Sequence, residues 1–339
     1  MPDAAVAVAT LLDGVRRPLL RAVVRVEPAR RIFVVRNERV LAGALAAVAT
    51  SFAVAAWQPL VALWLGAALF GVPHVVSGLR HVGVRERPAP ATCVFVALAV
   101  VVGAVELLGA GTRLADAAVR AYVVLFAAAA LVELGARRWL VGTAIVAAAA
   151  LALVSPRLTL IALAHLHGLG AVAWFTRRAR ARGVVVWPFV AAVALVMLGG
   201  ALGAFDRLWP ATLWAPRSAA ASIAAEAAGS ALGNASATAL HRALFLYAFG
   251  QALHFVIWLR LVPELDRPSK TPQTFRRALA GFEADFGRAA RPLLVACVVA
   301  VPLLLAGGGP AREAYFALTY FHVGLEAAAL ARSPKVALA

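Results

Sequence analysis

The chain is 339 residues long, with 63% hydrophobic and only 14% charged residues, and its mean hydropathy is +0.85. A soluble domain carries about 25% charged residues, so this composition excludes a water-soluble fold. The net charge of +17 comes from arginines that stand in short clusters between apolar runs. This arrangement argues against nucleic acid as a partner and is typical of a membrane protein that faces an anionic cytoplasmic leaflet.

The first segment, residues 1–39, is basic and amphipathic. Its arginines alternate with apolar residues such as Leu19 and Val23, and prolines interrupt it at Pro18 and Pro28. A secretory signal peptide has a longer uninterrupted apolar stretch and fewer arginines. We therefore predict a cytoplasmic segment that lies on the membrane surface. The arginines are Arg16, Arg17, Arg21, Arg25, Arg30, Arg31, Arg36 and Arg39.

The rest of the chain contains runs long enough to cross a bilayer. A spanning helix needs about 20 mostly apolar residues, and ten runs between 40 and 331 meet this criterion. We predict an all-α polytopic bundle with a transmembrane domain over 40–331 and a cytoplasmic tail over 332–339. The predicted spans are 40–57, 59–79, 91–110, 115–134, 139–154, 158–176, 184–204, 239–261, 291–309 and 311–331.

The loop charges predict the orientation of the spans. With the N-terminus inside, each inside loop carries at least as many Arg and Lys residues as the outside loops beside it, as the positive-inside rule requires. Ten spans then place the C-terminus inside as well. The two larger loops are 205–238 outside and 262–290 in the cytoplasm. Abundant Arg, Ala and Val with only two lysines suggest a bacterial inner-membrane protein.

All seven histidines lie in or at the ends of apolar spans. Four of the predicted spans run in the same direction and carry histidines at similar depth, namely His74, His165 with His167, His254, and His322. Imidazole is a common ligand for iron, copper and zinc, and ionisable groups inside a bilayer usually have a function. His165 and His167 are about 200° apart around a helix, so we expect only one of them to be a ligand. The alternative for each histidine is a hydrogen bond between helices.

Other polar residues share faces with these histidines. Glu326 follows His322 by four residues, and Ser77 follows His74 by three. Gln251 and Tyr247 precede His254 by three and seven residues. We expect these four side chains to orient the ligands by hydrogen bonds without binding the metal themselves. The alternative is that they form hydrogen bonds between helices.

Two further histidines lie nearer the span ends. His81 is seven residues beyond His74, near the expected headgroup level, where it would bind a phosphate or line an entrance. His241 lies at the outer end of its predicted span, and we interpret it as interfacial.

Three short elements resemble the bacterial Brp/Blh family of membrane-integral carotene dioxygenases. They are Gly71-Val72-Pro73-His74, Ala164-His165-Leu166-His167-Gly168, and Tyr247 followed by His254 and Trp258. The resemblance implies a non-haem iron held by histidines from several helices and an apolar, polyene-like substrate that enters from lipid.

The leading hypothesis is therefore a membrane-embedded, histidine-ligated Fe²⁺ oxygenase that acts on an apolar isoprenoid, carotenoid or lipid. No catalytic residue beyond the metal ligands is predicted. One alternative is an electron-transfer protein with haem b held by two histidines. Another is a non-enzymatic lipid or solute transporter whose histidines relay protons.

Overall fold

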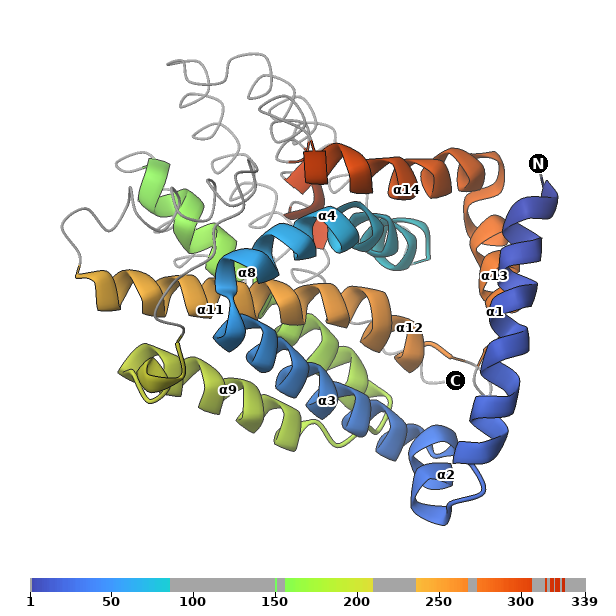
Figure 1. Ribbon diagram of the computed structural model, residues 1–339, viewed down its shortest axis with the longest axis horizontal. Helices are drawn as coiled ribbons and strands as arrows, with labels where there is room; N and C mark the ends of the chain where they lie inside the picture. The colour runs from blue at the N-terminus through green and yellow to red at the C-terminus, as the bar shows by residue number, and fades with distance from the viewer. Residues whose placement is uncertain are drawn as a thin grey trace, which may run out of the picture.

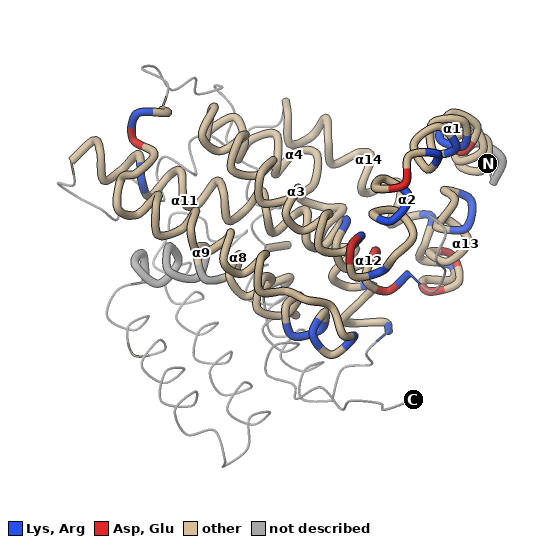
Figure 2. Tube along the Cα trace, turned by 90° about the horizontal axis from the view of Figure 1, so that it is seen from below, with Lys and Arg blue, Asp and Glu red and all other residues tan. Residues whose placement is uncertain are grey.

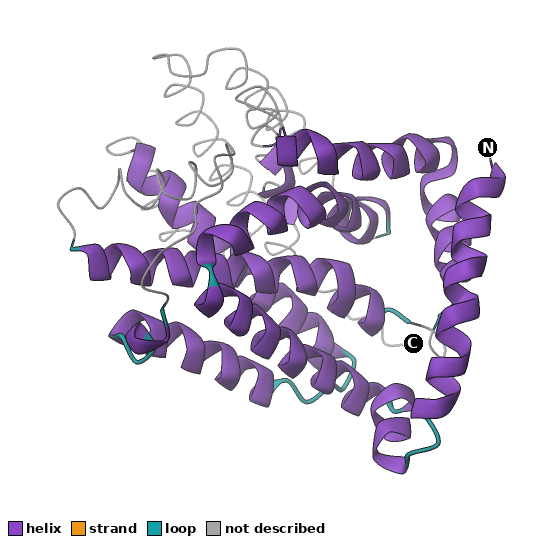
Figure 3. Ribbon diagram, viewed as in Figure 1, coloured by secondary structure: helices purple, strands orange, loops and turns teal. Residues whose placement is uncertain are grey.

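We describe the fold from a computed structural model. It describes residues 2–85, 150, 156–209, 236–267 and 273–306, and also residues 315, 318, 319, 321–323, 325 and 326. The predicted spans 91–110 and 115–134, nearly all of 139–154, most of the outer loop and the C-terminal tail lie outside these residues. The described residues form helices joined by short loops, with no strand among them (Figure 3). This agrees with the predicted all-α class.

Two of the predicted spans form a helical hairpin near the N-terminus. Helix α3 covers Arg36–Trp57, and α4 covers Pro59–Gly78. Gln58 between them has an extended backbone, with φ −153° and ψ 90°. Pro59 starts α4 at a position where its missing N–H leaves no hydrogen bond unmade. Helix α4 continues into a π-helical segment, η1, over Leu79–Val84.

The later spans follow the predicted ranges closely. Helix α8 covers Pro156–Ala181, and α9 covers Trp187–Leu202. Helix α11, Ala237–Val256, begins where the Ser236 side chain accepts a hydrogen bond from the Ala239 N–H. It continues through the π-helical η3, Ile257–Leu261, into the short α12, Val262–Leu265. Helix α14 covers Ala290–Ala306.

Among the described residues, four helices are long and apolar enough to cross a membrane. They are Arg36–Trp57, Pro59–Val84, Ala237–Leu265 and Phe275–Ala306. Helix α9 is apolar but has only 16 residues. The chain is thus an all-helical protein with several apolar helices suited to a membrane. The total of ten spans, and the location of both termini in the cytoplasm, stay predictions.

Helix α11 runs through the middle of the bundle and packs against α3, α4, α8 and α9 (Figure 1). Its buried residues include Phe245, Phe249 and Leu253. The contact with α8 is close at two glycines, because a Cβ atom added at Gly168 would lie 3.1 Å from the carbonyl oxygen of Gly250. Small residues let helices approach in this way within membranes, and here the approach brings the α8 histidines next to α11.

The described Lys and Arg residues gather mainly toward one end of the bundle (Figure 2). The helices at this end are α1, Pro2–Val23, and two shorter ones, α2, Glu27–Val34, and α13, Phe275–Phe286. Helix α1 runs crosswise to the long helices of the bundle (Figure 1).

Buried ion pairs join the bundle at this end. Arg39 of α3 pairs with Glu264 of α12, and Nη1 of Arg267 lies 2.9 Å from the same carboxylate. Charges buried this deeply are stable only when they are paired, so the pairs connect the start of α3 to the end of α12.

Candidate metal centre

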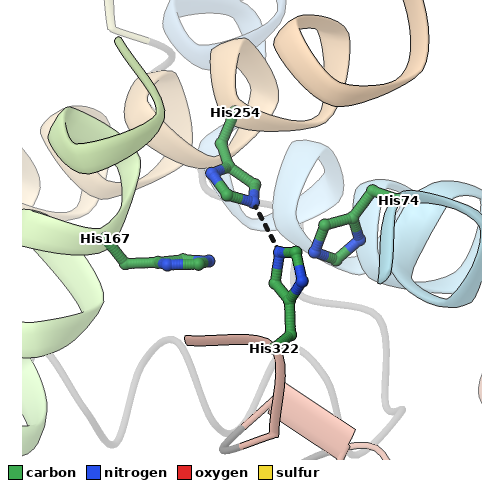
Figure 4. Close-up of side chains that lie close together, drawn as sticks. All are labelled: His74, His167, His254 and His322. Carbon is green, nitrogen blue, oxygen red and sulfur yellow. Dashed lines mark hydrogen bonds between the residues drawn. The ribbon is translucent and has the colours of Figure 1, made fainter. Parts of the chain in front are cut away.

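Four histidines meet inside the bundle, each from a different segment (Figure 4). His74 comes from α4, His167 from α8 and His254 from α11, while His322 lies in the helical residues near the C-terminus. All four are buried, and one possible ligand nitrogen from each lies within 4.8 Å of all the others. A buried four-histidine group of this kind can hold a metal ion.

The separation between two of the rings suits ligands of one metal. Nε2 of His254 lies 3.3 Å from Nε2 of His322. Two nitrogens bound at about 2.1 Å to one metal would be about 3.0 Å apart at neighbouring octahedral positions and about 3.4 Å apart in a tetrahedron. Opposite octahedral ligands would be about 4.2 Å apart. The four-histidine group, at up to 4.8 Å, therefore needs only a small contraction to surround an ion.

The local structure orients the His74 ring. Its Nδ1 lies 3.0 Å from the carbonyl oxygen of Phe70, one turn earlier in α4. If Nδ1 carries the proton and donates to this carbonyl, Nε2 has a free lone pair for a metal. A backbone carbonyl that accepts from the outer nitrogen in this way is the usual partner of a metal-bound histidine.

Glu326 lies among the same rings. Its carboxylate is 2.8 Å from Nε2 of His322, 3.1 Å from Nδ1 of His167 and 3.5 Å from Nε2 of His254. The sequence suggested an acceptor behind His322 alone, whereas here the carboxylate lies close to nitrogens of three histidines. Its negative charge would offset part of the charge of a bound cation.

A glycine makes room for one of the rings. A Cβ atom added at Gly78 would lie 2.9 Å from Cε1 and 3.1 Å from Nδ1 of His322. A similar approach occurs at Gly71, where an added Cβ would lie 2.6 Å from the Tyr315 ring. The α4 face beside the centre therefore has no side chain at two positions, and ring groups from the C-terminal segment occupy that space.

His165 does not join the four histidines. Its Nε2 lies 3.5 Å from the carbonyl oxygen of Ala243, and its ring centroid is 5.3 Å from that of Tyr247. The sequence left His165 and His167 as equal candidates, and the geometry favours His167. The reason is rotation about the axis of α8, because residues two apart point to different sides of a helix.

The hydrogen bonds of the other predicted supporting residues go to groups outside the four-histidine group. The Ser77 hydroxyl donates to the carbonyl oxygen of Trp258 at 2.6 Å, and so joins α4 to η3. Nε2 of Gln251 lies 3.4 Å from the hydroxyl of Tyr247, one turn earlier in α11.

The two outlying histidines have other partners. Nδ1 of His81 lies 2.9 Å from the Asp266 carboxylate at the arginine-rich end. The expected phosphate position is thus filled by a side chain of the protein itself. The His241 ring lies 5.5 Å from the Trp209 ring, at the end of α11 opposite to Asp266.

Sequence reasoning did not predict an aromatic pair beside the centre. The rings of Trp174 and Trp258 are 4.8 Å apart, and the Trp258 ring is 6.2 Å from that of His322. The guanidinium of Arg178 lies 5.0 Å from the Trp174 ring. Because these residues come from α8 and η3, no local pattern in the sequence could have revealed the pair.

Comparison of the chain with protein-family models, curated proteins and solved structures found no match. The resemblance to the carotene dioxygenases consequently depends on the three short elements quoted above.

Proposed function

We propose that the protein is a membrane-embedded non-haem iron oxygenase acting on an apolar isoprenoid, carotenoid or lipid. His74, His167, His254 and His322 would be the iron ligands. The observation that carries the proposal is the meeting of four buried imidazoles from four segments of the chain. Ionisable groups are costly inside a bilayer, so four of them at one point indicate a function rather than packing.

The donor set fits iron. Four imidazoles with one nearby carboxylate suit divalent iron as well as zinc or copper. When bound, iron would supply the capacity to activate dioxygen, which zinc lacks. The protein residues would hold the ion, offset its charge through Glu326, and orient the ring of His74 through Phe70.

Apart from Glu326, apolar side chains lie beside the centre. The Phe255 ring lies 4.7 Å from that of His74, and Trp258 and Leu325 are buried beside the same group of helices. Apolar side chains of this kind would keep water from the centre and would suit contact with a hydrocarbon chain. An apolar substrate is therefore better suited to this site than a charged one, and the resemblance to carotene dioxygenases supports the same class.

The haem alternative has less support. A haem held by two histidines needs its planar macrocycle between the two axial nitrogens. Nε2 of His254 and of His322 are only 3.3 Å apart, and the imidazoles of His74 and His167 stand at their sides. A macrocycle between His254 and His322 would therefore require these rings to move apart.

The deciding measurement is the metal content per chain of the detergent-purified protein, together with its absorption spectrum. We expect about one iron per chain and no Soret band. An intense Soret band would establish the haem alternative. No metal after growth with added iron would contradict the proposal and favour a transporter, in which the histidines and Glu326 relay protons.

The two histidines of α8 provide a matched pair of variants. We expect His167→Ala to lose the iron and His165→Ala to retain it, because only His167 lies in the four-histidine group. Membrane insertion should be the same for both variants. Retention of iron by His167→Ala, or its loss from both variants, would show that the ligand set is wrong.

A further inference from the structure

Helix α1 presents its apolar side chains outward. Val8, Leu11, Leu12, Val15 and Leu19 are all exposed, with exposed fractions from 43% for Leu12 to 69% for Leu11. At 3.6 residues per turn these five positions fall within an arc of about 100°. They thus form one continuous apolar face, which we call the outer face of α1.

The side of α1 that packs against the protein includes charged residues. The positions that pack are Ala9, Asp13, Arg16 and Leu20, which lie in a separate arc of about 60°. Asp13 is 3% exposed and Ala9 is 6% exposed. A helix on a water-soluble protein buries its apolar face and exposes its charges. Helix α1 instead buries the carboxylate of Asp13 and exposes valines and leucines, which is the pattern expected where the outer face meets an apolar environment.

The buried carboxylate holds α1 against α13. Asp13 accepts hydrogen bonds from the N–H groups of Phe275 at 2.9 Å and Arg276 at 3.2 Å, the first two residues of α13. Burial raises the pKa of Asp13, but these two hydrogen bonds and the charges of Arg16 and Arg17 lower it more, so the net shift is downward. The rotation of α1 about its axis is therefore set by a polar contact.

The adjoining helix α13 is in turn joined to the bundle. Asp285 of α13 lies 2.5 Å from Nε of Arg80 and 2.8 Å from Nη2 of Arg85, both near the end of the His74-bearing helix. Helix α1 lies crosswise at the arginine-rich end of the long helices, as both views show (Figures 1 and 2). A helix placed crosswise at the end of membrane-spanning helices runs along the membrane surface.

The remaining side of α1 is polar. Thr10, Arg17 and Arg21 are exposed there, away from both the outer face and the side of α1 that packs against the protein. Residues 1–39 contain eight arginines against four acidic residues, Asp3, Asp13, Glu27 and Glu38. A helix with an apolar face and a basic face binds at the boundary between headgroups and acyl chains, most strongly when the lipids are anionic.

We propose that α1 is an in-plane anchor. Its outer face would lie among the upper acyl chains of an anionic leaflet, and Arg17 and Arg21 would lie among the headgroups. This inference does not depend on the metal bound by the histidines. The sequence predicted only that residues 1–39 lie on the membrane surface. The proposal specifies which side of α1 enters the lipid and names the Asp13 contact that fixes the rotation of the helix.

Spin labels on the full-length protein test the proposal. Single cysteines would be introduced in a chain with Cys93→Ala and Cys297→Ala, labelled with a nitroxide, and reconstituted in vesicles of phosphatidylethanolamine and phosphatidylglycerol. Collisions with oxygen report on lipid, and collisions with a water-soluble nickel chelate report on water. We expect labels at Leu11, Val15 and Leu19 to have an oxygen-to-nickel ratio several-fold higher than labels at Thr10 and Arg21.

Two outcomes would overturn the lipid assignment. Equal nickel accessibility at Leu11 and Thr10 would mean that the outer face meets water. Low accessibility to both reagents at Leu11 and Val15 would mean that protein covers the face, such as a second copy of the chain. Because all labelled positions are exposed, the labels should not disturb folding, and size-exclusion chromatography would check this.

The charge of the leaflet is tested separately. In vesicles of phosphatidylcholine alone we expect the ratio at Leu11 to fall toward the value at Thr10. The double variant Arg17→Gln with Arg21→Gln should lower it in the same way in anionic vesicles, whereas Thr10→Gln should not. An unchanged ratio at Leu11 in both lipids would overturn the anionic part of the proposal.

Discussion

At the scale of single residues, the position of one imidazole depends on a glycine four residues beyond His74. Gly78 of α4 lies against the His322 ring, and an added Cβ would be 2.9 Å from Cε1. Contacts this short force the neighbouring group to move. The His322 ring would have to shift by several tenths of an ångström, and metal sites tolerate such shifts poorly.

We therefore expect Gly78→Ala to weaken metal binding about tenfold or more, which corresponds to about 1.4 kcal/mol. A titration against a competing chelator would measure the change. The matched control is Gly43→Ala in α3, where an added Cβ would lie 3.6 Å from Cδ2 of Leu261, an ordinary contact. Alanine is also favoured over glycine within a helix by up to about 1 kcal/mol. Equal metal affinities for the two variants would contradict the role assigned to Gly78.

At the scale of elements, both α4 and α11 change into π-helix shortly after their histidine. Segment η1 begins five residues after His74, and η3 begins three residues after His254. Short π-helical segments are rare and occur frequently at functional sites. The Ser77 hydroxyl bonds the Trp258 carbonyl within η3 at 2.6 Å. The end of α4 is therefore held against η3 next to the candidate metal centre.

A second element-scale contact joins these segments at the arginine-rich end. Asp266, just after α12, lies 2.9 Å from Nδ1 of His81 in η1. It also lies 2.7 Å from Nη1 of Arg182 and 3.2 Å from Nη2 of Arg178. Burial raises the pKa of Asp266, but the hydrogen bond from His81 and the charges of Arg178 and Arg182 lower it more, to about 2 from an ordinary value of 3.8.

This lowered pKa predicts a pH dependence of stability. A carboxylate whose pKa is lower in the folded state stabilises the fold above its unfolded pKa and loses that contribution as pH falls through its folded pKa. We expect Asp266→Asn to reduce the free energy of unfolding by about 2 kcal/mol at pH 6. The difference from the wild type should shrink between about pH 4 and pH 2. Thermal unfolding in detergent over this range would measure it, and a difference independent of pH would contradict the assignment.

At the scale of the whole molecule, the orientation in the membrane is the main prediction. Ten spans place both termini in the cytoplasm and the 205–238 loop outside. We expect a green fluorescent protein fused after residue 339 to fluoresce, because it folds only in the cytoplasm. Alkaline phosphatase fused after residue 209 should be active, because it folds only outside. The reverse result at either position would show that the number of spans before it is wrong.

Much of the fold could be predicted because hydropathy and charge are local properties. The runs 40–57 and 239–261 lie entirely within the helices Arg36–Trp57 and Ala237–Leu265. In lipid, a helix must satisfy the hydrogen bonds of its own backbone whatever its neighbours are. The sequence did not indicate the π-helical turns, because these depend on contacts between helices such as that of Ser77 with Trp258.

The sequence by itself determined that the chain is helical, has several apolar runs suited to a membrane, and carries histidines on several of these runs. Length, hydropathy and spacing along one helix are enough for these conclusions. Only the tertiary structure decided that His167 rather than His165 lies with the other three histidines, that Glu326 contacts three of them, and that Gly78 makes room for His322. These features depend on the rotation of each helix about its axis, which is set by packing between segments far apart in the sequence.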